Sequence, residues 1–295
     1  YRYSNLSFKR WVELCQPLEY ATTVSLYGWG EPLLNPDYER MFDYVLANFP
    51  GIEINVSTNG ILMNGKWTRR FASCDGLTVN VSLNAASAKT YRFLSQRDEF
   101  ERIIENIRRL IELRNGRNSG SPLVVLSFVA IRENIVELPD FVRLAARLGA
   151  DKVVVQDLIL LNQDLRKYSL TPYAEFAKSI FLVALNTARE MGISLIPFVP
   201  VHFLPTDSDS FEENGRLERK KSARLCLEPW IYLRIAMDGG IQLCCYSNEN
   251  MGNLYKQSLA DIWNGEKFRH YRTRVNSSDL PGDCSKCPKK VGLSL

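Results

Sequence analysis

The segment Thr22-Thr23-Val24-Ser25-Leu26-Tyr27-Gly28-Trp29-Gly30-Glu31-Pro32 places a short apolar run directly before a glycine-containing turn. Its first six residues include β-branched and aromatic side chains, which favour a strand, and the two glycines then interrupt that pattern. Asn35-Pro36 follows, and proline is common at the first position of a helix. The segment therefore predicts a strand, a turn and a helix in succession.

The same unit of strand, polar turn and amphipathic helix recurs along the chain. Further strands are predicted over residues 52–56, 77–83, 123–131 and 152–156, with a short sixth strand over 193–198. Apolar strands that alternate with amphipathic helices indicate a parallel sheet covered on both faces. Six strands are too few for a complete eight-stranded barrel. We therefore predict an α/β fold, a partial (β/α)6 barrel of the TIM type.

Glycine and small polar residues gather where four of these strands end. The four groups are residues 28–32, 57–60, 82–84 and 132–134. The carboxyl ends of parallel strands lie at one edge of a sheet, and ligands bind there in α/β folds. The same residue types also form ordinary turns and helix caps, so a single group is equally consistent with a turn. Four groups at one edge indicate a ligand site.

The C-terminal part of the chain carries a spaced set of cysteines. Cys226 precedes Leu-Glu-Pro-Trp, and Cys244 follows a predicted hairpin whose turn is Asp238-Gly239. Cys284 and Cys287 form a Cys-x-x-Cys pair. Four thiolates can close a tetrahedral sulfur cage, which suits either zinc or an iron–sulfur cluster.

The remaining three cysteines are interpreted as packing residues. Cys15 lies in a predicted helix that Ser7 caps, and Cys74 lies outside every motif. Cys245 is adjacent to Cys244 in a predicted strand, where successive side chains point to opposite faces. Only one of these two neighbours is therefore expected to be a metal ligand.

Composition limits the classes of function. The net charge of +4 is too small to indicate a nucleic-acid partner, and the sequence has no apolar run long enough for a membrane span. An odd count of seven cysteines without a secretion signal indicates a reducing, cytoplasmic location. The two histidines, His202 and His270, are far apart in sequence, which argues against a histidine-based metal site.

Together these motifs resemble those of the radical S-adenosylmethionine (AdoMet) superfamily. Residues 28–32 are similar to its Gly-Gly-Glu-Pro motif, and residues 57–60 and 82–84 resemble the same catalytic core. The tail resembles the SPASM and Twitch extensions of that superfamily, which bind auxiliary clusters. The residues that meet the pattern of these extensions are Cys226, Asp238, Gly239, Cys244, Gly252, Asn253, Leu254, Ser258, Leu259, Ile262, Trp263, Asn264, Cys284 and Cys287.

The resemblance implies an enzyme of the oxidoreductase type. Such an enzyme cleaves AdoMet at a reduced [4Fe–4S] cluster, and the resulting 5′-deoxyadenosyl radical abstracts hydrogen from a substrate, here a small molecule or a peptide that is oxidised or crosslinked. A flavodoxin- or ferredoxin-type reductant is also implied. No catalytic side chain is identified.

The resemblance also assigns ligand-binding residues. An auxiliary [4Fe–4S] cluster would take Cys226, Cys244, Cys284 and Cys287, with Cys244 preferred to Cys245 because of its spacing from Gly239. Arg132 would pair with the AdoMet carboxylate, although a plain surface charge explains it equally well. The full set of implied AdoMet-binding residues is Gly28, Trp29, Gly30, Glu31, Pro32, Ser57, Asn59, Ser82, Asn84 and Arg132.

The sequence departs from the family pattern in two places. It contains no Cys-x-x-x-Cys-x-x-Cys motif, so we expect the first strand and the ligands of the catalytic cluster to lie before Tyr1, and the chain as written to be inactive. No cysteine follows Cys287, which predicts a single auxiliary cluster in the Twitch arrangement.

The expected domains are a partial barrel over residues 1–204, a polar linker over 205–224 and a Twitch-like hairpin and helix domain over 225–295. The alternative is a non-catalytic protein whose cysteine cage holds zinc or a cluster for structure or for partner binding.

Overall fold

The computed structural model describes residues 5–117, 119–160, 163–199, 201–204, 225–285 and 287. The predicted linker over residues 205–224 lies outside these ranges. The chain divides into two compact units. The first, called the barrel unit, comprises Thr22–Tyr38 and Val45–Phe211. The second, called the cysteine unit, comprises Tyr1–Ala21, Glu39–Tyr44 and Glu212–Leu295.

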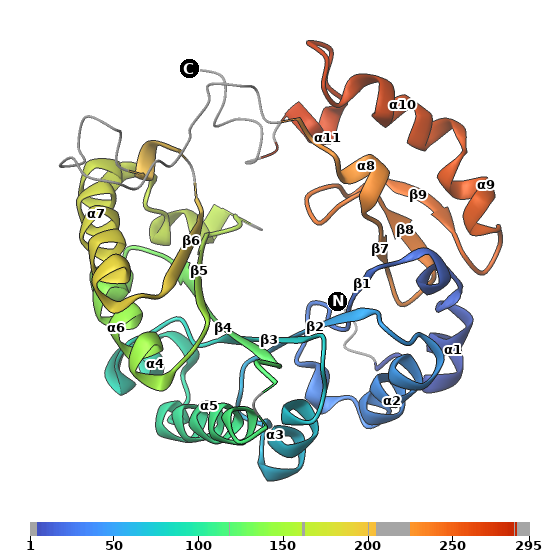
Figure 1. Cartoon of the computed structure of the whole chain (residues 1–295). Helices are drawn as coiled ribbons and strands as arrows, with labels where there is room; N and C mark the ends of the chain where they lie inside the picture. Colours follow the sequence, from blue (N-terminus) through green and yellow to red (C-terminus); the bar gives the residue numbers. More distant parts are fainter. Residues whose placement is uncertain are drawn as a thin grey trace. The chain divides into compact units, whose positions relative to one another are not determined.

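The barrel unit is built on a sheet of six parallel strands in which each strand pairs with the next along the chain. This order confirms the predicted α/β fold. Figure 1 shows the sheet curving, with its helices on the convex side. The strands are β1 (Thr23–Ser25), β2 (Glu53–Thr58), β3 (Leu77–Ser82), β4 (Leu123–Ala130), β5 (Lys152–Asp157) and β6 (Ser194–Phe198).

The helices that connect these strands include two that the sequence pattern did not predict. Both α3 (Gly65–Ala72) and α4 (Ala88–Ser95) are only eight residues long, too short for a clear apolar period. The longer amphipathic helices between the strands are α5 (Phe100–Asn115), α6 (Leu138–Leu148) and α7 (Ala174–Met191). The short 3-10 turns are η2 (Pro32–Leu34), η3 (Ile135–Glu137), η4 (Gln163–Tyr168), η5 (Thr171–Tyr173) and η6 (Val201–Phe203).

The predicted start of the second helix was wrong. Helix α2 (Tyr38–Asn48) begins two residues after Pro36 instead of at it. Asn35 accounts for the difference, because its Oδ1 accepts the Asp37 backbone N–H at 3.0 Å and holds a local turn before the helix.

In β2 and β3 one face of the sheet is apolar and the other is polar, so the prediction of apolar strands covered on both faces was wrong for these two strands, whereas β4 is buried from Val124 to Phe128. In β2 and β3, Val56, Val79 and Val81 are fully buried, whereas the intervening residues are only partly buried. Successive strand residues point to opposite faces. The apolar set therefore packs towards the helices, and the polar set, Asn55, Ser57, Asn80 and Ser82, lines the concave face.

The cysteine unit contains a separate three-stranded antiparallel sheet. The predicted hairpin between β7 (Arg234–Ile235) and β8 (Gly240–Gln242) is present, and Gly239 adopts φ +80° in its turn. The third strand, β9 (Asn250–Asn253), was not predicted, since its glycine and asparagines are poor strand formers. The other elements are α1 (Phe8–Glu13), η1 (Gln16–Tyr20), α8 (Glu228–Ile231), α9 (Leu259–Trp263), α10 (Glu266–Arg274) and α11 (Gly282–Ser285).

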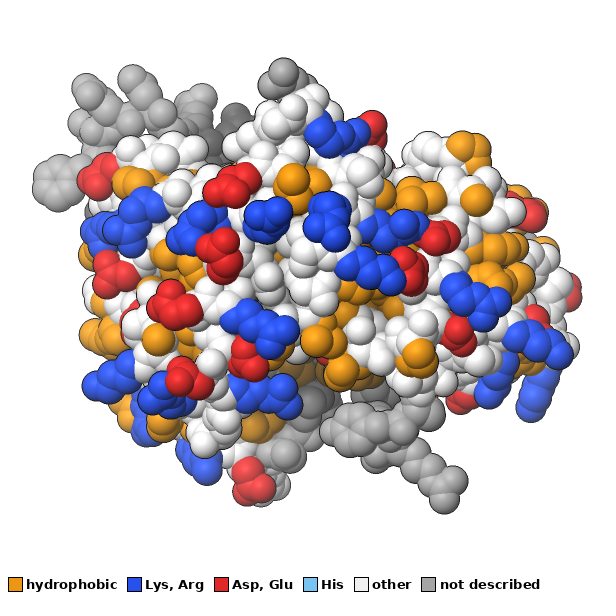
Figure 2. Space-filling model, turned by 90° about the horizontal axis from the view of Figure 1, so that it is seen from below, with side chains coloured by type: hydrophobic (Ala, Val, Ile, Leu, Met, Phe, Trp, Pro, Cys, Tyr) orange, Lys and Arg blue, Asp and Glu red, His pale blue; other side chains and the backbone are white. Residues whose placement is uncertain are grey.

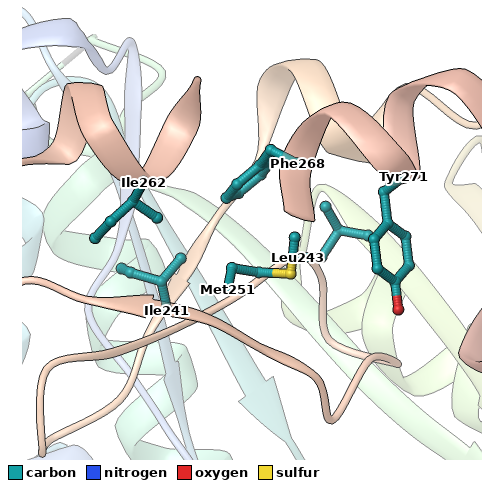
Figure 3. Close-up of a cluster of buried hydrophobic side chains, with 6 residues drawn as sticks. All are labelled: Ile241, Leu243, Met251, Ile262, Phe268 and Tyr271. Carbon is teal, nitrogen blue, oxygen red and sulfur yellow. The ribbon is translucent and has the colours of Figure 1, made fainter. Parts of the chain in front are cut away.

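A compact apolar core joins this small sheet to α9 and α10. Figure 3 shows the six side chains, each at most 5% exposed, gathered between the strands and the two helices. Ser258 caps α9, because its hydroxyl accepts the Asp261 N–H at 3.1 Å. The core residues are Ile241, Leu243, Met251, Ile262, Phe268 and Tyr271.

Two of the three cysteines interpreted as packing residues are buried in agreement with the prediction. Cys15 is 5% exposed and Cys74 is 7% exposed, and each thiol donates to a backbone oxygen four residues earlier. Burial raises the pKa of the Cys15 thiol to about 12, so the neutral thiol persists at ordinary pH.

Helix length and surface charge bear on membrane and nucleic-acid binding. Among the described residues, no helix is long and apolar enough to cross a membrane. On the face drawn in Figure 2, Lys and Arg side chains are interleaved with Asp and Glu, so this face is mixed in charge.

Candidate functional site

The four cysteines predicted as ligands line one cavity in the cysteine unit. Cys226 lies just before α8, Cys244 follows β8, Cys284 lies in α11, and Cys287 follows that helix. The turn that carries the last two is closed by backbone hydrogen bonds from Cys284 N to the Pro281 oxygen (2.8 Å) and from Cys287 N to the Cys284 oxygen (3.2 Å).

The structure corrects the reasoning about the adjacent cysteines. Strand β8 ends at Gln242, so Cys244 and Cys245 lie in the turn that follows and are not within a strand. Cys244 nevertheless lines the cavity, whereas Cys245 is exposed and lies outside the cavity lining.

The thiols influence one another electrostatically. Burial, followed by the neighbouring Cys244, Cys226 and Cys287 side chains, raises the pKa of Cys284 to about 11. Burial likewise raises the pKa of Cys244. Several thiolates in one cavity repel each other unless a cation is present, and metal binding deprotonates such ligands. The donor set therefore fits a positively charged metal centre.

Four thiolates could hold either a zinc ion or an iron–sulfur cluster. Among the described residues, no group of three or more His, Cys, Asp and Glu side chains is close enough to hold a single metal ion. A zinc ion needs all four sulfurs within about 2.3 Å of one point. In a [4Fe–4S] cluster each iron takes its own thiolate, so the sulfurs stand further apart.

At the carboxyl edge of the barrel-unit sheet, Glu31 joins the first two loops. Its carboxylate accepts the Thr58 hydroxyl at 2.7 Å and the Asn59 backbone N–H at 2.7 Å. It also accepts the Leu33 N–H at 3.2 Å. Because both oxygens of its carboxylate accept these bonds, Glu31 holds the first two loops of the edge together. The adjoining backbone of Gly28 and Gly30 is left open, since a Cβ placed on either glycine would meet no atom within 4 Å.

The loop after β2 depends on Gly60. This residue has φ +78°, and a Cβ placed on it would lie 2.9 Å from Ile103 Cγ2 and 3.0 Å from Val81 Cγ1. The Asn106 amide donates to the Gly60 oxygen at 2.9 Å, and the Asn59 side chain accepts the Ile61 N–H at 2.9 Å. Only glycine fits this position without movement of its neighbours.

The ends of β3 and β4 are tied together by two asparagines. Asn84 has φ +61°, and its Oδ1 accepts the Val129 N–H at 2.8 Å. Asn134 is fully buried and donates its amide to the Asn84 and Val129 oxygens at 3.0 and 2.9 Å. Its Oδ1 accepts the Ile131 N–H at 2.8 Å. Residues 132–134 were predicted to contribute to a ligand site. The side chain of Asn134 instead holds the ends of β3 and β4 together.

Two polar residues on the concave face were missed from the sequence. Ser127 of β4 donates to Asn80 Oδ1 of β3 at 2.5 Å. The alternation of polar and apolar residues in β3 was the signal that could have found Asn80. Within the described ranges, the hydroxyls of Ser57 and Ser82 have no hydrogen-bond partner, so both can bond a ligand.

Arg132 is located on the surface of the barrel unit. Its guanidinium bonds Glu133 Oε1 at 2.8 Å, and this side chain, together with Tyr173, raises the pKa of Arg132. The second Glu133 oxygen is buried and has no partner in the described part of the chain. Arg132 therefore already has one carboxylate partner.

Two family models match the sequence in separate segments. The radical SAM superfamily model matches residues 2–145, and the iron–sulfur cluster-binding domain SPASM matches residues 226–288. The second segment contains all four cysteines that line the cavity.

Curated relatives fall into two groups. The mycofactocin maturase MftC of Mycobacterium tuberculosis is 31% identical over 42% of this chain and 29% of its own length. The chain therefore matches less than a third of the length of that relative. The probable GTP 3′,8-cyclase of Methanocaldococcus jannaschii is 29% identical over 82% of this chain and 74% of its own length.

Solved structures share the fold at low sequence identity. Streptococcus suis SuiB bound to S-adenosylmethionine has a TM-score of 0.67 and 16% identity, covering 97% of this chain and 64% of that one. The protein anSMEcpe with bound AdoMet has a TM-score of 0.65 and 14% identity, covering 97% and 75%. With the two family models and these relatives, the chain belongs to the radical SAM superfamily and carries a SPASM domain.

Proposed function

We propose that this chain carries the AdoMet-binding sheet of a radical enzyme of the oxidoreductase type, and that its cysteine unit binds one auxiliary [4Fe–4S] cluster. The observation that carries the proposal is the convergence of Cys226, Cys244, Cys284 and Cys287 on one cavity. The segment that contains them is the one matched by an iron–sulfur cluster-binding domain. The expected domain division, with a barrel over residues 1–204, a linker over 205–224 and an auxiliary domain over 225–295, is part of this proposal.

The iron–sulfur form of the site is favoured over the zinc form by the family comparison. The segment that carries the four cysteines matches an iron–sulfur cluster-binding domain. Four thiolates can hold either metal centre, so the metal content of the protein separates the two forms.

We assign AdoMet to the carboxyl edge of the barrel-unit sheet. Glu31 holds the first two loops together, and the open backbone at Gly28 and Gly30 leaves room for a ligand. Ser57 and Ser82 supply hydroxyls on the concave face. The complete proposed set is Gly28, Trp29, Gly30, Glu31, Pro32, Ser57, Asn59, Ser82, Asn84 and Arg132.

AdoMet held at this edge together with a reduced cluster would supply the chemistry of hydrogen-atom abstraction from a substrate. The residues of the carboxyl edge bind and orient AdoMet, and the glycine backbone allows its close approach. The 295 residues contain no Cys-x-x-x-Cys-x-x-Cys motif, so we propose that this chain by itself does not cleave AdoMet. A flavodoxin- or ferredoxin-type protein is the proposed reductant.

A peptide is the first proposed substrate. Two proteins of the same fold were solved with peptides, SuiB with its precursor peptide SuiA and anSMEcpe with the Cp18Cys peptide. A small molecule, such as a nucleotide, is the second candidate. The similarity to a probable GTP 3′,8-cyclase over 82% of the chain favours it.

Equilibrium dialysis with radiolabelled AdoMet tests the placement of the ligand. The chain should bind AdoMet, and the double variant Ser57→Ala/Ser82→Ala should bind it about tenfold more weakly, since each lost hydrogen bond contributes about 0.5–1.5 kcal/mol. Ser179→Ala is the matched control, because Ser179 is exposed on α7 and, within the part of the chain that the structure describes, its hydroxyl bonds only the Phe176 oxygen. Equal affinities for all three proteins would reject this AdoMet site.

A further inference from the structure

The four cysteines come from three separate arms of the cysteine unit. Cys226 lies before α8, Cys244 lies in the turn after β8, and Cys284 and Cys287 belong to the α11 turn. The apolar core does not reach Cys226, which lies between exposed Leu225 and Leu227. Other contacts must therefore hold the three arms in fixed positions relative to one another.

Asn276 holds the first arm. Its Oδ1 accepts the Cys226 backbone N–H at 2.8 Å, and its Nδ2 donates to the Cys226 oxygen at 3.1 Å. The two bonds involve both backbone groups of one residue, 50 positions earlier in the chain. The preceding Val275 is 1% exposed and lines the cysteine cavity, so Asn276 is itself firmly placed.

Asp283 joins the other two arms. It directly precedes Cys284, and its Oδ2 accepts both the Ser247 hydroxyl and the Asn248 backbone N–H at 2.9 Å. Ser247 and Asn248 belong to the same turn as Cys244, and Ser247 N donates to the Cys244 oxygen at 3.4 Å. One carboxylate oxygen thus connects the Cys244 turn to the Cys284 turn.

We infer that Asn276 and Asp283 are positioning residues that hold the three cysteine arms in place for the metal centre. The inference rests on the proposed auxiliary cluster and adds two residues to it. Neither side chain needs to touch iron. Each acts by fixing the backbone that carries a ligand, and the loss of such outer contacts commonly lowers metal affinity about 10–100-fold.

The donors and acceptors predict opposite results for two conservative substitutions. Asn276→Asp keeps the acceptor for Cys226 N–H but places an oxygen against the Cys226 oxygen, so one attraction becomes a repulsion. Asp283→Asn keeps one carbonyl oxygen, which can accept both bonds that Asp283 Oδ2 now accepts. The first change should release the Cys226 arm, and the second should leave the cage nearly intact.

The test is the rate at which anaerobically reconstituted protein loses iron to an excess of a coloured iron chelator, read with the absorbance and the electron paramagnetic resonance spectrum of the cluster. Asn276→Asp and Asp283→Ala should lose iron about 10–100 times faster than the wild type. Asp283→Asn should lose iron at a rate within about threefold of the wild-type rate, which corresponds to a difference of about 0.65 kcal/mol in the activation free energy of iron loss. Asp279→Asn is the control, because the exposed Asp279 side chain pairs only with Arg274 among the described residues.

The outcomes separate this inference from the proposal on which it rests. If the wild type binds iron and sulfide but Asn276→Asp releases iron at the wild-type rate, the positioning role is overturned and the cluster proposal stands. Asp283→Asn losing iron as fast as Asp283→Ala would overturn the role assigned to Asp283. If the wild type takes up no iron and sulfide, both the auxiliary cluster and the inference are overturned. Far-ultraviolet circular dichroism of each metal-free variant identifies any variant that fails to fold. If Asp283→Ala does not fold, the iron-release rates of Asn276→Asp and Asp283→Asn test the inference.

Discussion

Replacing Gly60 by alanine tests the geometry of the carboxyl edge at one defined point. Gly60 has φ +78°, in the left-handed region, where a residue with a Cβ costs roughly 1–2 kcal/mol. The added Cβ would also lie 2.9 Å from Ile103 Cγ2 and 3.0 Å from Val81 Cγ1, both in the packed interior. Overpacking of this kind costs about 1–3 kcal/mol.

A matched glycine separates the two contributions. Gly51 has φ +84° but no atom within 4 Å of an added Cβ, so Gly51→Ala carries the conformational cost alone. The reduced freedom of the unfolded chain offsets that cost by about 0.4–1 kcal/mol in both variants. We therefore expect Gly51→Ala to lower the free energy of unfolding by about 1 kcal/mol, and Gly60→Ala to lower it by about 2–4 kcal/mol.

Urea unfolding followed by tryptophan fluorescence measures both values, with equal slopes against urea required for the comparison. If the losses in the free energy of unfolding for Gly60→Ala and Gly51→Ala differ by less than about 0.5 kcal/mol, Gly60 is not packed against Ile103 and Val81. That result would refute this packing of the loop after β2.

Three further predictions concern one residue each. Burial is the main cause of the raised pKa of Asp157, which the Leu158 N–H and the charge of His202 partly oppose, so the folded chain holds this proton more tightly than the unfolded chain. The stability that the bound proton contributes is complete below pH 3.8, the unfolded pKa, and is lost as pH rises through the folded pKa. Asp157→Asn should therefore unfold at a higher temperature than the wild type near neutral pH, and at the same temperature in acid. A difference in unfolding temperature that stays constant with pH would contradict the assignment. Asn134→Ala removes three buried hydrogen bonds and should lower the free energy of unfolding, measured in urea, by about 3 kcal/mol or more. The exposed Asn186→Ala is the control and should lower it by less than about 0.5 kcal/mol. Equal losses in the two variants would show that Asn134 does not connect β3 to β4. Ser258→Ala removes the cap of α9 and should cost about 1 kcal/mol, with faster amide exchange confined to that helix and its neighbours; unchanged exchange there would argue against the cap.

The local pattern of the sequence was sufficient for elements that their own residues determine. The apolar runs predicted all six strands of the barrel unit, and the Asp238-Gly239 turn predicted the hairpin that precedes Cys244. The spacing of the four cysteines led to one cavity, although the argument that separated Cys244 from Cys245 assumed a strand that ends earlier.

Contacts between distant segments were not predictable in the same way. Glu137 accepts the Ala86 N–H and the Ser87 and Thr90 hydroxyls at 2.6–2.8 Å, although it lies about 50 positions further along the chain. No local pattern indicates such a contact, because a glutamate before a helix is an ordinary surface residue. The same reason explains why Asn276 was missed, since only the folded chain brings it to Cys226.

The polar concave face was missed for a different reason. The runs in β2 and β3 were interpreted as continuous apolar strands, yet they alternate, with Asn55, Ser57, Asn80 and Ser82 between buried valines and isoleucine. Period-two alternation marks a sheet with one solvated face. Counting that period strand by strand is enough to predict the candidate ligand face from the sequence alone.

The central claim is that four cysteines hold an iron–sulfur cluster, and metal analysis of the anaerobically reconstituted chain tests it most directly. We expect about four iron and four acid-labile sulfide per chain and no stoichiometric zinc, with this content lost in Cys244→Ala and kept in Cys245→Ala. One zinc per chain without sulfide, or equal iron and sulfide in the two cysteine variants, would contradict the account.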